Sequence, residues 1–362
     1  MSEDLKAVRK MYRGQGDAPF EFPEELLCGR LVKDRVLRYG ENPGQSAAFY
    51  KQIDVKGPSL ATANIVKENP EKKLSYINLL DADAAIKVIR RFKKLYPKEA
   101  VSTIIKHANP SGIAKARTML GAYRTARDCD PISAFGGVVG FSDEVNEEVA
   151  EEVSQKFVEV LVAPDYESKA LEILNKKKDL RILQIESLDK PLMDDGFEYR
   201  SVQGGVLVQQ RFQSRIDSKD NLEAVSKRKP EEKDYRAAIF NWAALPFINS
   251  NAVVIGDENK TLGIGSGQRS RIHAARLAVY YANTLSKDPA GTKGKAMASD
   301  AFFPDRDSID LAGICGIEVI VAPLGSINDG KIIQAVDEYG MVMFTTRPIP
   351  KDRSLCERAF SH

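Results

Sequence analysis

Lys106 and His107 stand side by side where a buried strand is expected to end. The preceding residues, 101–105, are mostly β-branched, which favours a strand. In α/β proteins, ligands and catalytic groups gather at strand ends. A neutral imidazole can accept a proton, and an ammonium beside it can stabilise a developing negative oxygen. The pair is therefore suited to catalysing acyl or formyl transfer. The alternative is a loop histidine beside a solvated lysine, with no role in catalysis.

Two other motifs are suited to binding an anion. Arg38 and Tyr39 place a guanidinium and a phenol on consecutive residues, a combination suited to phosphate. The glycine-rich run 263–268 is predicted to be a ligand-facing turn before a helix from about Ser270, whose N-terminal amides could meet an anion. It is not a dinucleotide fingerprint, because Gln268 stands where the third glycine belongs. Both motifs could also be ordinary surface or turn residues.

Two later segments carry further candidates. Asn251 is a polar amide at the mouth of an apolar strand, just before a hairpin-like segment, 252–261. Loop 300–307 combines an aromatic pair with acids. Aromatic pairs are more often core than ligand contacts, but the neighbouring acids favour a functional loop.

The composition is that of an ordinary protein with about two domains. The 362 residues are 43% hydrophobic and 29% charged with a formal net charge of +2, so we expect no global attraction to nucleic acid or to an anionic membrane. The four cysteines lie far apart without a C-x-x-C, which argues against a zinc site or disulfide framework and fits a reducing cytoplasm. The chain shows neither a leading apolar segment nor a long apolar run, so a secreted or membrane-spanning product is not expected.

A near-repeat indicates a duplicated architecture. Segments 158–164 and 317–323 are apolar strand patterns closed by proline, and each follows a related turn, 133–136 or 299–302. A polar stretch, 209–233, lies between the two units. We therefore predict an α/β protein of two duplicated three-layer α/β/α halves. Residues 1–24 would be an N-terminal extension, 25–205 the first half and 206–362 the second.

Helical patterns alternate with the expected strands. Ala85, Ile89 and Phe92 are spaced to share one helix face. Segment 331–339 is predicted to be a helix between a strand ending at Ala322 and a strand over 341–345, a β-α-β unit that implies parallel pairing.

Jointly, these motifs resemble the transformylase domain of the bifunctional purine-synthesis enzymes, whose activity is AICAR (phosphoribosylaminoimidazolecarboxamide) formyltransferase. The resemblance rests on segments 37–43, 106–112, 133–136, 250–251, 263–272, 299–307 and 325–326. It implies two cytidine-deaminase-like halves without a catalytic zinc. Too few residues precede Arg38 for the family's IMP cyclohydrolase domain, so we expect a free-standing transformylase with a separate cyclohydrolase.

The resemblance implies a reaction and a set of site residues. The formyl group of the co-substrate 10-formyltetrahydrofolate would pass to the 5-amino group of AICAR, with His107 as proton acceptor and Lys106 stabilising the transition state. The implied AICAR contacts are Arg38, Tyr39, Gly136, Glu159, Asn251, Arg271, Phe302 and Arg358. The implied folate contacts are Ile272, Asp307, Ser326 and Ile327. Members of the family are homodimers with active sites at the subunit interface, so a cytoplasmic homodimer is expected.

Two places depart from the family pattern. Asp305 stands where the family commonly has a phenylalanine expected to contact folate. Near the C-terminus, Arg347 and Arg358 both could hold the nucleotide phosphate, and we favour Arg358 because the Arg-x-Phe-x-His ending fits the family.

Other functions were weighed against this one. A zinc nucleoside deaminase requires His-x-Glu and Pro-Cys-x-x-Cys, and the sequence has neither. A non-catalytic purine-nucleotide-binding protein and a transformylase with a different formyl donor are the alternatives. Intact Lys106, His107 and Asn251 favour an enzyme.

Overall fold

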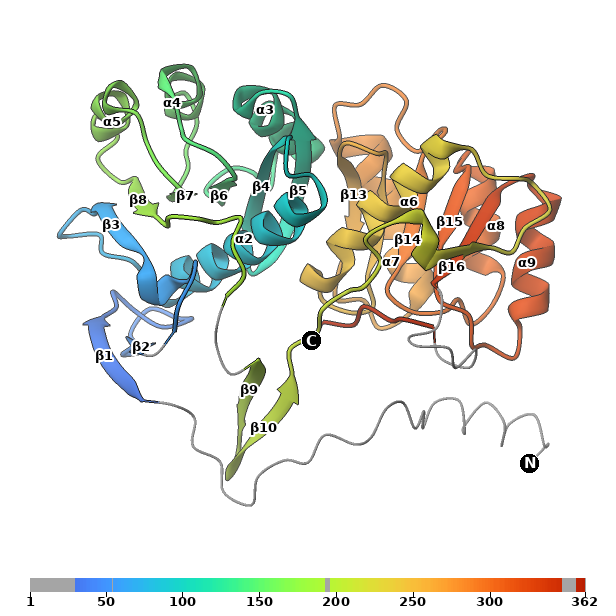
Figure 1. Cartoon of the computed structure of the whole chain (residues 1–362), viewed down its shortest axis with the longest axis horizontal. Coiled ribbons are helices and arrows are strands. Elements are labelled where there is room, and N and C mark those ends of the chain that lie inside the picture. The colour runs from blue at the N-terminus through green and yellow to red at the C-terminus, as the bar shows by residue number, and fades with distance from the viewer. Residues whose placement is uncertain (1–29, 54, 193–195, 347–355, 362) are drawn as a thin grey trace.

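The structure is a computed structural model that describes residues 30–53, 55–192, 196–346 and 356–361. Two six-stranded mixed sheets, each covered by helices on both faces, make up most of these residues (Figure 1). The predicted architecture of two duplicated α/β halves is therefore confirmed.

The first half is built on the sheet β3-β8-β7-β6-β4-β5. Helix α2 covers one face of this sheet, and α3, α4 and α5 cover the other (Figure 1). The elements are β3 (Asn64–Lys67), α2 (Tyr76–Leu95), β4 (Ala100–Lys106), β5 (Asn109–Ala116), α3 (Met119–Cys129), β6 (Val138–Phe141), α4 (Glu147–Ser154), β7 (Val160–Ala163), α5 (Ser168–Asn175) and β8 (Arg181–Gln184).

The second half repeats this order of elements and strands. Its sheet is β11-β16-β15-β14-β12-β13, with α6 on one face and α7, α8 and α9 on the other. The elements are β11 (Leu222–Ala224), α6 (Glu232–Ala244), β12 (Val253–Gly256), β13 (Thr261–Gly265), α7 (Arg271–Tyr280), β14 (Ala296–Ser299), α8 (Asp307–Ile314), β15 (Val319–Val321), α9 (Asp329–Glu338) and β16 (Val342–Thr346). Each sheet has an antiparallel hairpin at one edge, an antiparallel pair next to it, two parallel pairs and a last antiparallel pair at the other edge.

The sequence repeat corresponds to equivalent strands, but the turns proposed to accompany it do not. Segments 158–164 and 317–323 contain β7 and β15, which hold the same place in their sheets. Turn 133–136 precedes β6, whereas 299–302 begins at the end of β14, so the likeness of these turns is not part of the repeat. Short runs of similar composition occur at both ends of strands, which is why the sequence alone misled here.

Local patterns explain the helices. Ser75 caps α2 by accepting from the Asn78 amide at 3.2 Å, and Ala85, Ile89 and Phe92 form a fully buried face as predicted. The predicted helix at 331–339 is α9, and β15 and β16 on either side of it pair in parallel. Among the described residues, no helix is both long and apolar enough to cross a membrane.

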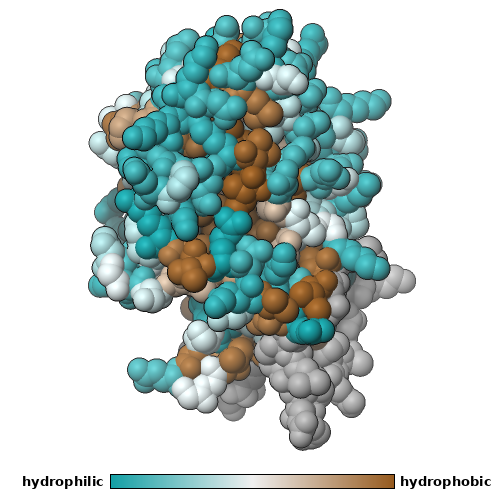
Figure 2. Space-filling view, turned by 90° about the vertical axis from the view of Figure 1, so that its left-hand side faces the viewer, coloured by the Kyte–Doolittle hydropathy of each residue, from teal (hydrophilic) through white to brown (hydrophobic). Residues whose placement is uncertain are grey.

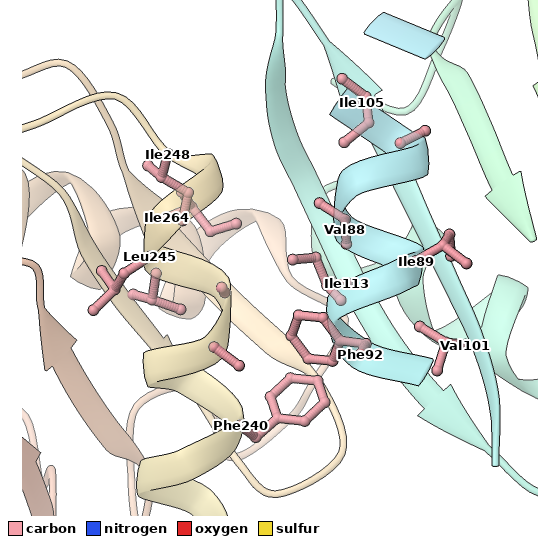
Figure 3. Packing of buried hydrophobic residues seen from close by; sticks show 14 of the residues in the cluster. Val88, Ile89, Phe92, Val101, Ile105, Ile113, Phe240, Leu245, Ile248 and Ile264 are labelled. Atoms are coloured by element: carbon pink, nitrogen blue, oxygen red, sulfur yellow. The ribbon is translucent and has the colours of Figure 1, made fainter. Parts of the chain in front are cut away.

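The halves pack through their α2 and α6 faces. Phe92 of α2 meets Phe240 of α6 edge to face, with ring centroids 4.9 Å apart, within an apolar cluster drawn from both halves (Figure 3). The edge strands β5 and β13 also meet, because the Ile113 amide donates to Thr261 Oγ1 at 3.0 Å. These contacts set the geometry between loops that belong to different halves.

Two antiparallel hairpins lie outside the two sheets. They are β1 (Leu31–Val36) with β2 (Ala48–Gln52), and β9 (Phe197–Val202) with β10 (Gly205–Gln210). Residue 205 begins β10, and we propose it as the division between the halves. Figure 2 shows apolar side chains among polar ones on the side of the molecule that carries β1 and β2 in Figure 1; exposed there are Leu31, Val32, Val36 and Tyr50.

Candidate functional site

His107 lies at the tip of the β4–β5 hairpin, as the sequence predicted for a strand end. His107 and Ala108 form the two-residue turn between these strands, with φ values of 54° and 57°. The His107 side chain is exposed, and Lys106 Nζ donates to the Phe135 carbonyl oxygen at 2.6 Å. An ammonium has three N–H donors, so this bond leaves donors for a ligand oxygen. A base and a cation therefore occupy consecutive residues where β4 meets the turn.

A cavity of about 180 Å³ opens beside this turn and is shared by both halves. From the first half it is lined by Lys106, His107, Asn109, Pro110, Ser111, Asp130 and Ser133, and from the second by Leu262, Ile264, Ser266 and Tyr281. A larger cavity of about 560 Å³ lies at the base of the β9–β10 hairpin, between Lys94, Phe197, Arg211 and Asp217. The smaller cavity is the candidate site because both Lys106 and His107 line it.

Asn109 ties the His107 turn to the second half. Its Nδ2 donates to the His107 carbonyl at 3.0 Å, while its Oδ1 accepts from the Asn249 amide at 3.1 Å and from Ser266 Oγ at 2.7 Å. The segment at Asn249 continues directly to Asn251, whose side chain donates to the Gln268 carbonyl at 2.7 Å. The structure thus brings His107 and Asn251 to the same junction between the halves.

Three of the predicted AICAR contacts, Arg38, Tyr39 and Glu159, lie around the start of α2, and a fourth, Gly136, lies in the turn that binds Lys106. The Tyr39 carbonyl accepts from the Tyr76 amide at 3.0 Å, and the Arg38 guanidinium lies 5.3 Å from the Tyr39 ring centroid. Glu159 accepts from Asn78 Nδ2 of α2 at 2.8 Å. Gly136 adopts a φ of 72°, which favours glycine, in the turn whose Phe135 carbonyl binds Lys106.

Arg271 is buried in the second half. At the start of α7, its Nη1 donates to the Ala252 carbonyl at 3.0 Å and pairs closely with Asp300, whose side chain is fully buried. A guanidinium and a carboxylate buried this deeply are tolerated only because they pair with each other. Arg271 therefore holds the ends of β12 and β14 together next to Asn251, in addition to any contact with a ligand.

The C-terminal segment places Arg358 beside Phe302. The guanidinium carbon lies 5.3 Å from the Phe302 ring centroid, within cation–π distance. The preceding Glu357 is buried and accepts from Trp242 Nε1 at 3.2 Å and from the Arg215 amide at 2.9 Å. Glu357 thus anchors the segment that presents Arg358. Arg347, the rival phosphate ligand, lies outside the described residues.

The predicted folate contacts come from three neighbouring elements of the second half. Ile272 is on α7, Asp307 begins α8, and Ser326 and the exposed Ile327 lie in the loop before α9. Asn328 Nδ2 donates to the Pro304 carbonyl at 2.8 Å and so joins that loop to the segment before α8.

Asp329 fixes the same loop. Its carboxylate accepts from the Gly325 amide at 2.8 Å and the Ser326 amide at 3.1 Å. Burial raises the pKa of Asp329, and the two amide bonds act in the opposite direction.

The glycine-rich run does not form the turn that the sequence predicted. Gly263 and Gly265 are inside β13, and a Cβ on either would collide with the α7 backbone, at Ala278 and Ala274. They are glycines because strand and helix approach closely. Residues 266–270 connect β13 to α7, which begins close to the predicted position; Ser270 takes its N-cap position without a side-chain capping hydrogen bond.

Three residues of this site were missed at the sequence level: Asp81, Asn109 and Glu357. Asp81 lies four residues before Ala85 and eight before Ile89, so an acid occupied the predicted buried helix face. That conflict was a signal for a buried carboxylate with a specific partner. Asn109 and Glu357 offered no comparable signal, because the bonds from Asn109 to Asn249 and Ser266, and those of Glu357, join distant parts of the chain.

A comparison with protein families fits this geometry. The sequence model of the AICARFT/IMPCHase bienzyme family matches residues 5–281, which include both members of the Lys106–His107 pair. The chain belongs to this family. Its members are enzymes of purine biosynthesis. The match ends after α7, so Phe302, Arg358 and most of the predicted folate contacts lie beyond it.

Proposed function

We propose that this AICARFT/IMPCHase family protein transfers the formyl group of 10-formyltetrahydrofolate to the 5-amino group of AICAR, giving FAICAR and tetrahydrofolate. The observation that carries the proposal is the Lys106–His107 pair, with His107 exposed, at the wall of a cavity within the region that the family model matches. No catalytic metal takes part in the proposed reaction.

The proposed roles follow from the chemistry of the amine. The 5-amino group is conjugated with the imidazole of AICAR and is a poor nucleophile, so His107 accepts its proton as nitrogen attacks the formyl carbon. Lys106 stabilises the oxygen that becomes negative in the tetrahedral intermediate. Cleavage of the bond from the formyl carbon to N10 of the folate then returns that proton to N10. A positioned base contributes roughly 10² to 10⁴ in rate.

A direct assay tests this function and its alternatives. The purified protein is mixed with AICAR and either 10-formyltetrahydrofolate or formate plus ATP, and FAICAR is measured. Product with the folate alone is expected. Product only with formate and ATP would identify a different donor, whereas calorimetric binding of AICAR without product from either would indicate a non-catalytic nucleotide-binding protein.

We expect Arg358→Ala to raise KM for AICAR by about tenfold or more, because a charge-assisted hydrogen bond to phosphate contributes about 1.5 to 3 kcal/mol. Arg38→Ala should act in the same way. Steady-state kinetics with AICAR and with its dephosphorylated nucleoside separate phosphate binding from other effects, since wild type and Arg358→Ala should use the nucleoside equally poorly. If Arg347→Ala shows this pattern and Arg358→Ala does not, the phosphate is bound by Arg347.

Asp305→Phe should lower KM for the folate several-fold, because an aromatic contact contributes about 0.5 to 1.5 kcal/mol beyond burial of area. In the structure Asp305 is exposed and accepts from the Arg306 amide at 2.8 Å. KM for AICAR, measured on the same variant, should hardly change. An unchanged folate KM would mean that residue 305 points away from the folate.

We also propose a homodimer. The exposed apolar residues of β1 and β2 support it, because burial of exposed apolar side chains favours association. Light scattering over a dilution series, with activity measured in parallel, should show a dimer that loses activity when it dissociates.

A further inference from the structure

The turn at His107 has a backbone conformation that histidine and alanine do not favour. Two-residue hairpin turns with positive φ at both positions favour Asn-Gly, Asp-Gly or Gly-Gly. Here the positions are His107 and Ala108, at φ 54° and 57°. A non-glycine residue in this region persists only where the surrounding structure holds it. Some group outside the turn must therefore favour this conformation.

Asp81 of α2 makes the contacts that hold it. One carboxylate oxygen, Oδ1, accepts from the Ala108 amide at 2.6 Å, and the other, Oδ2, accepts from the His107 amide at 3.2 Å. Each oxygen thus binds one of the two amides of the turn, which sets the orientation of the turn as well as its distance from the helix. Asp81 is 5% exposed, so water competes little for these bonds.

Asp81 is itself held in a rigid place. It belongs to the capped N-terminal part of α2, and its neighbours Leu79 and Ala82 are buried in the core shared by both halves. Burial raises the pKa of Asp81, and the amide bonds from Ala108 and His107 counteract this by favouring the carboxylate. On the opposite side of the turn, Asn109 binds the His107 carbonyl.

We propose that Asp81 is a positioning residue that holds the His107-Ala108 turn in its left-handed conformation and so aims the imidazole at the reacting amine. Its catalytic consequence rests on the proposed function, whereas its effect on the turn does not. Because a displacement of about 1 Å in a reacting group can cost roughly 10² in rate, loss of this contact should affect kcat far more than AICAR binding.

The experiment compares three variants with wild type. Asp81→Ala should lower kcat at least tenfold and leave KM for AICAR within about threefold. Asp83→Ala is the matched control, since it removes a carboxylate of the same helix that pairs with Lys87 at 2.7 Å, and it should keep wild-type kcat. The double variant Asp81→Ala with Ala108→Gly should recover most of kcat, because glycine adopts positive φ without the steric cost of a Cβ.

Hydrogen exchange of the amides at 107 and 108 provides a readout that does not depend on activity. Both should be protected in wild type and in Asp83→Ala, and exchange at least tenfold faster in Asp81→Ala. Asp81→Asn, which keeps the volume, replaces Asp81→Ala if the alanine variant does not fold. Wild-type kcat in Asp81→Ala, unchanged exchange, or no recovery in the double variant would each overturn the proposal. If wild type itself makes no FAICAR, the proposed function fails while the exchange result still decides the role of Asp81.

Discussion

Replacing His107 with alanine is expected to abolish turnover while AICAR affinity changes by less than about tenfold. A general base acts mainly in the transition state and contributes roughly 10² to 10⁴ in rate, so its loss appears in kcat. His107 is exposed and makes its described hydrogen bonds through its backbone, to Asp81 and Asn109. Removing the imidazole should therefore leave the fold intact. Single-turnover kinetics and calorimetric AICAR titration measure the two effects separately.

Lysine variants provide the comparison for this result. Lys106→Ala should lose activity to a similar degree, because the developing oxyanion loses a donor typically worth about 3 to 4 kcal/mol. Lys106→Arg keeps the charge but moves it, so partial activity is expected. If His107→Ala keeps more than about a tenth of wild-type kcat, another group is the proton acceptor.

The second large effect concerns stability. Asp300→Ala should lower the free energy of unfolding by about 3 to 5 kcal/mol, because it leaves the buried Arg271 guanidinium without its carboxylate partner. The side chains of Asp300 and Arg271 are 0% and 5% exposed. Asp300 Oδ2 also accepts from the Ala252 amide at 3.2 Å, and that bond is lost as well. Urea denaturation followed by circular dichroism gives the change in free energy.

A surface ion pair supplies the matched control. Asp310 pairs with Arg306 at 2.8 Å on the exposed side of α8, and Asp310→Ala should lower the free energy of unfolding by less than about 1 kcal/mol. The double variant Arg271→Met with Asp300→Leu should regain much of the lost stability. If it regains stability but binds AICAR poorly, Arg271 contacts the ligand in addition to its structural role. An equally small loss for Asp300→Ala and Asp310→Ala would show that the buried pair contributes little to stability.

What the sequence determined on its own was local. Patterns of apolar residues identified the buried face of α2 and the equivalent strands β7 and β15, because burial of a helix face or a strand depends on spacing within a few residues. The same reasoning placed Lys106 and His107 at a strand end. The site residues contributed by β14, α7 and the C-terminal segment came from the family resemblance, and their roles stay predictions.

Tertiary structure decided everything that depends on distant partners. From the sequence, Gly263 and Gly265 were predicted to belong to a ligand-binding turn. In the structure they allow β13 to approach α7 closely. A glycine needed for close packing and a glycine needed for a turn look the same in a sequence. The two amides of the His107 turn are held by Asp81, a residue 26 and 27 positions earlier in the chain. Such contacts follow from how strands, helices and turns pack against one another in space, and spacing along the chain does not identify the partners.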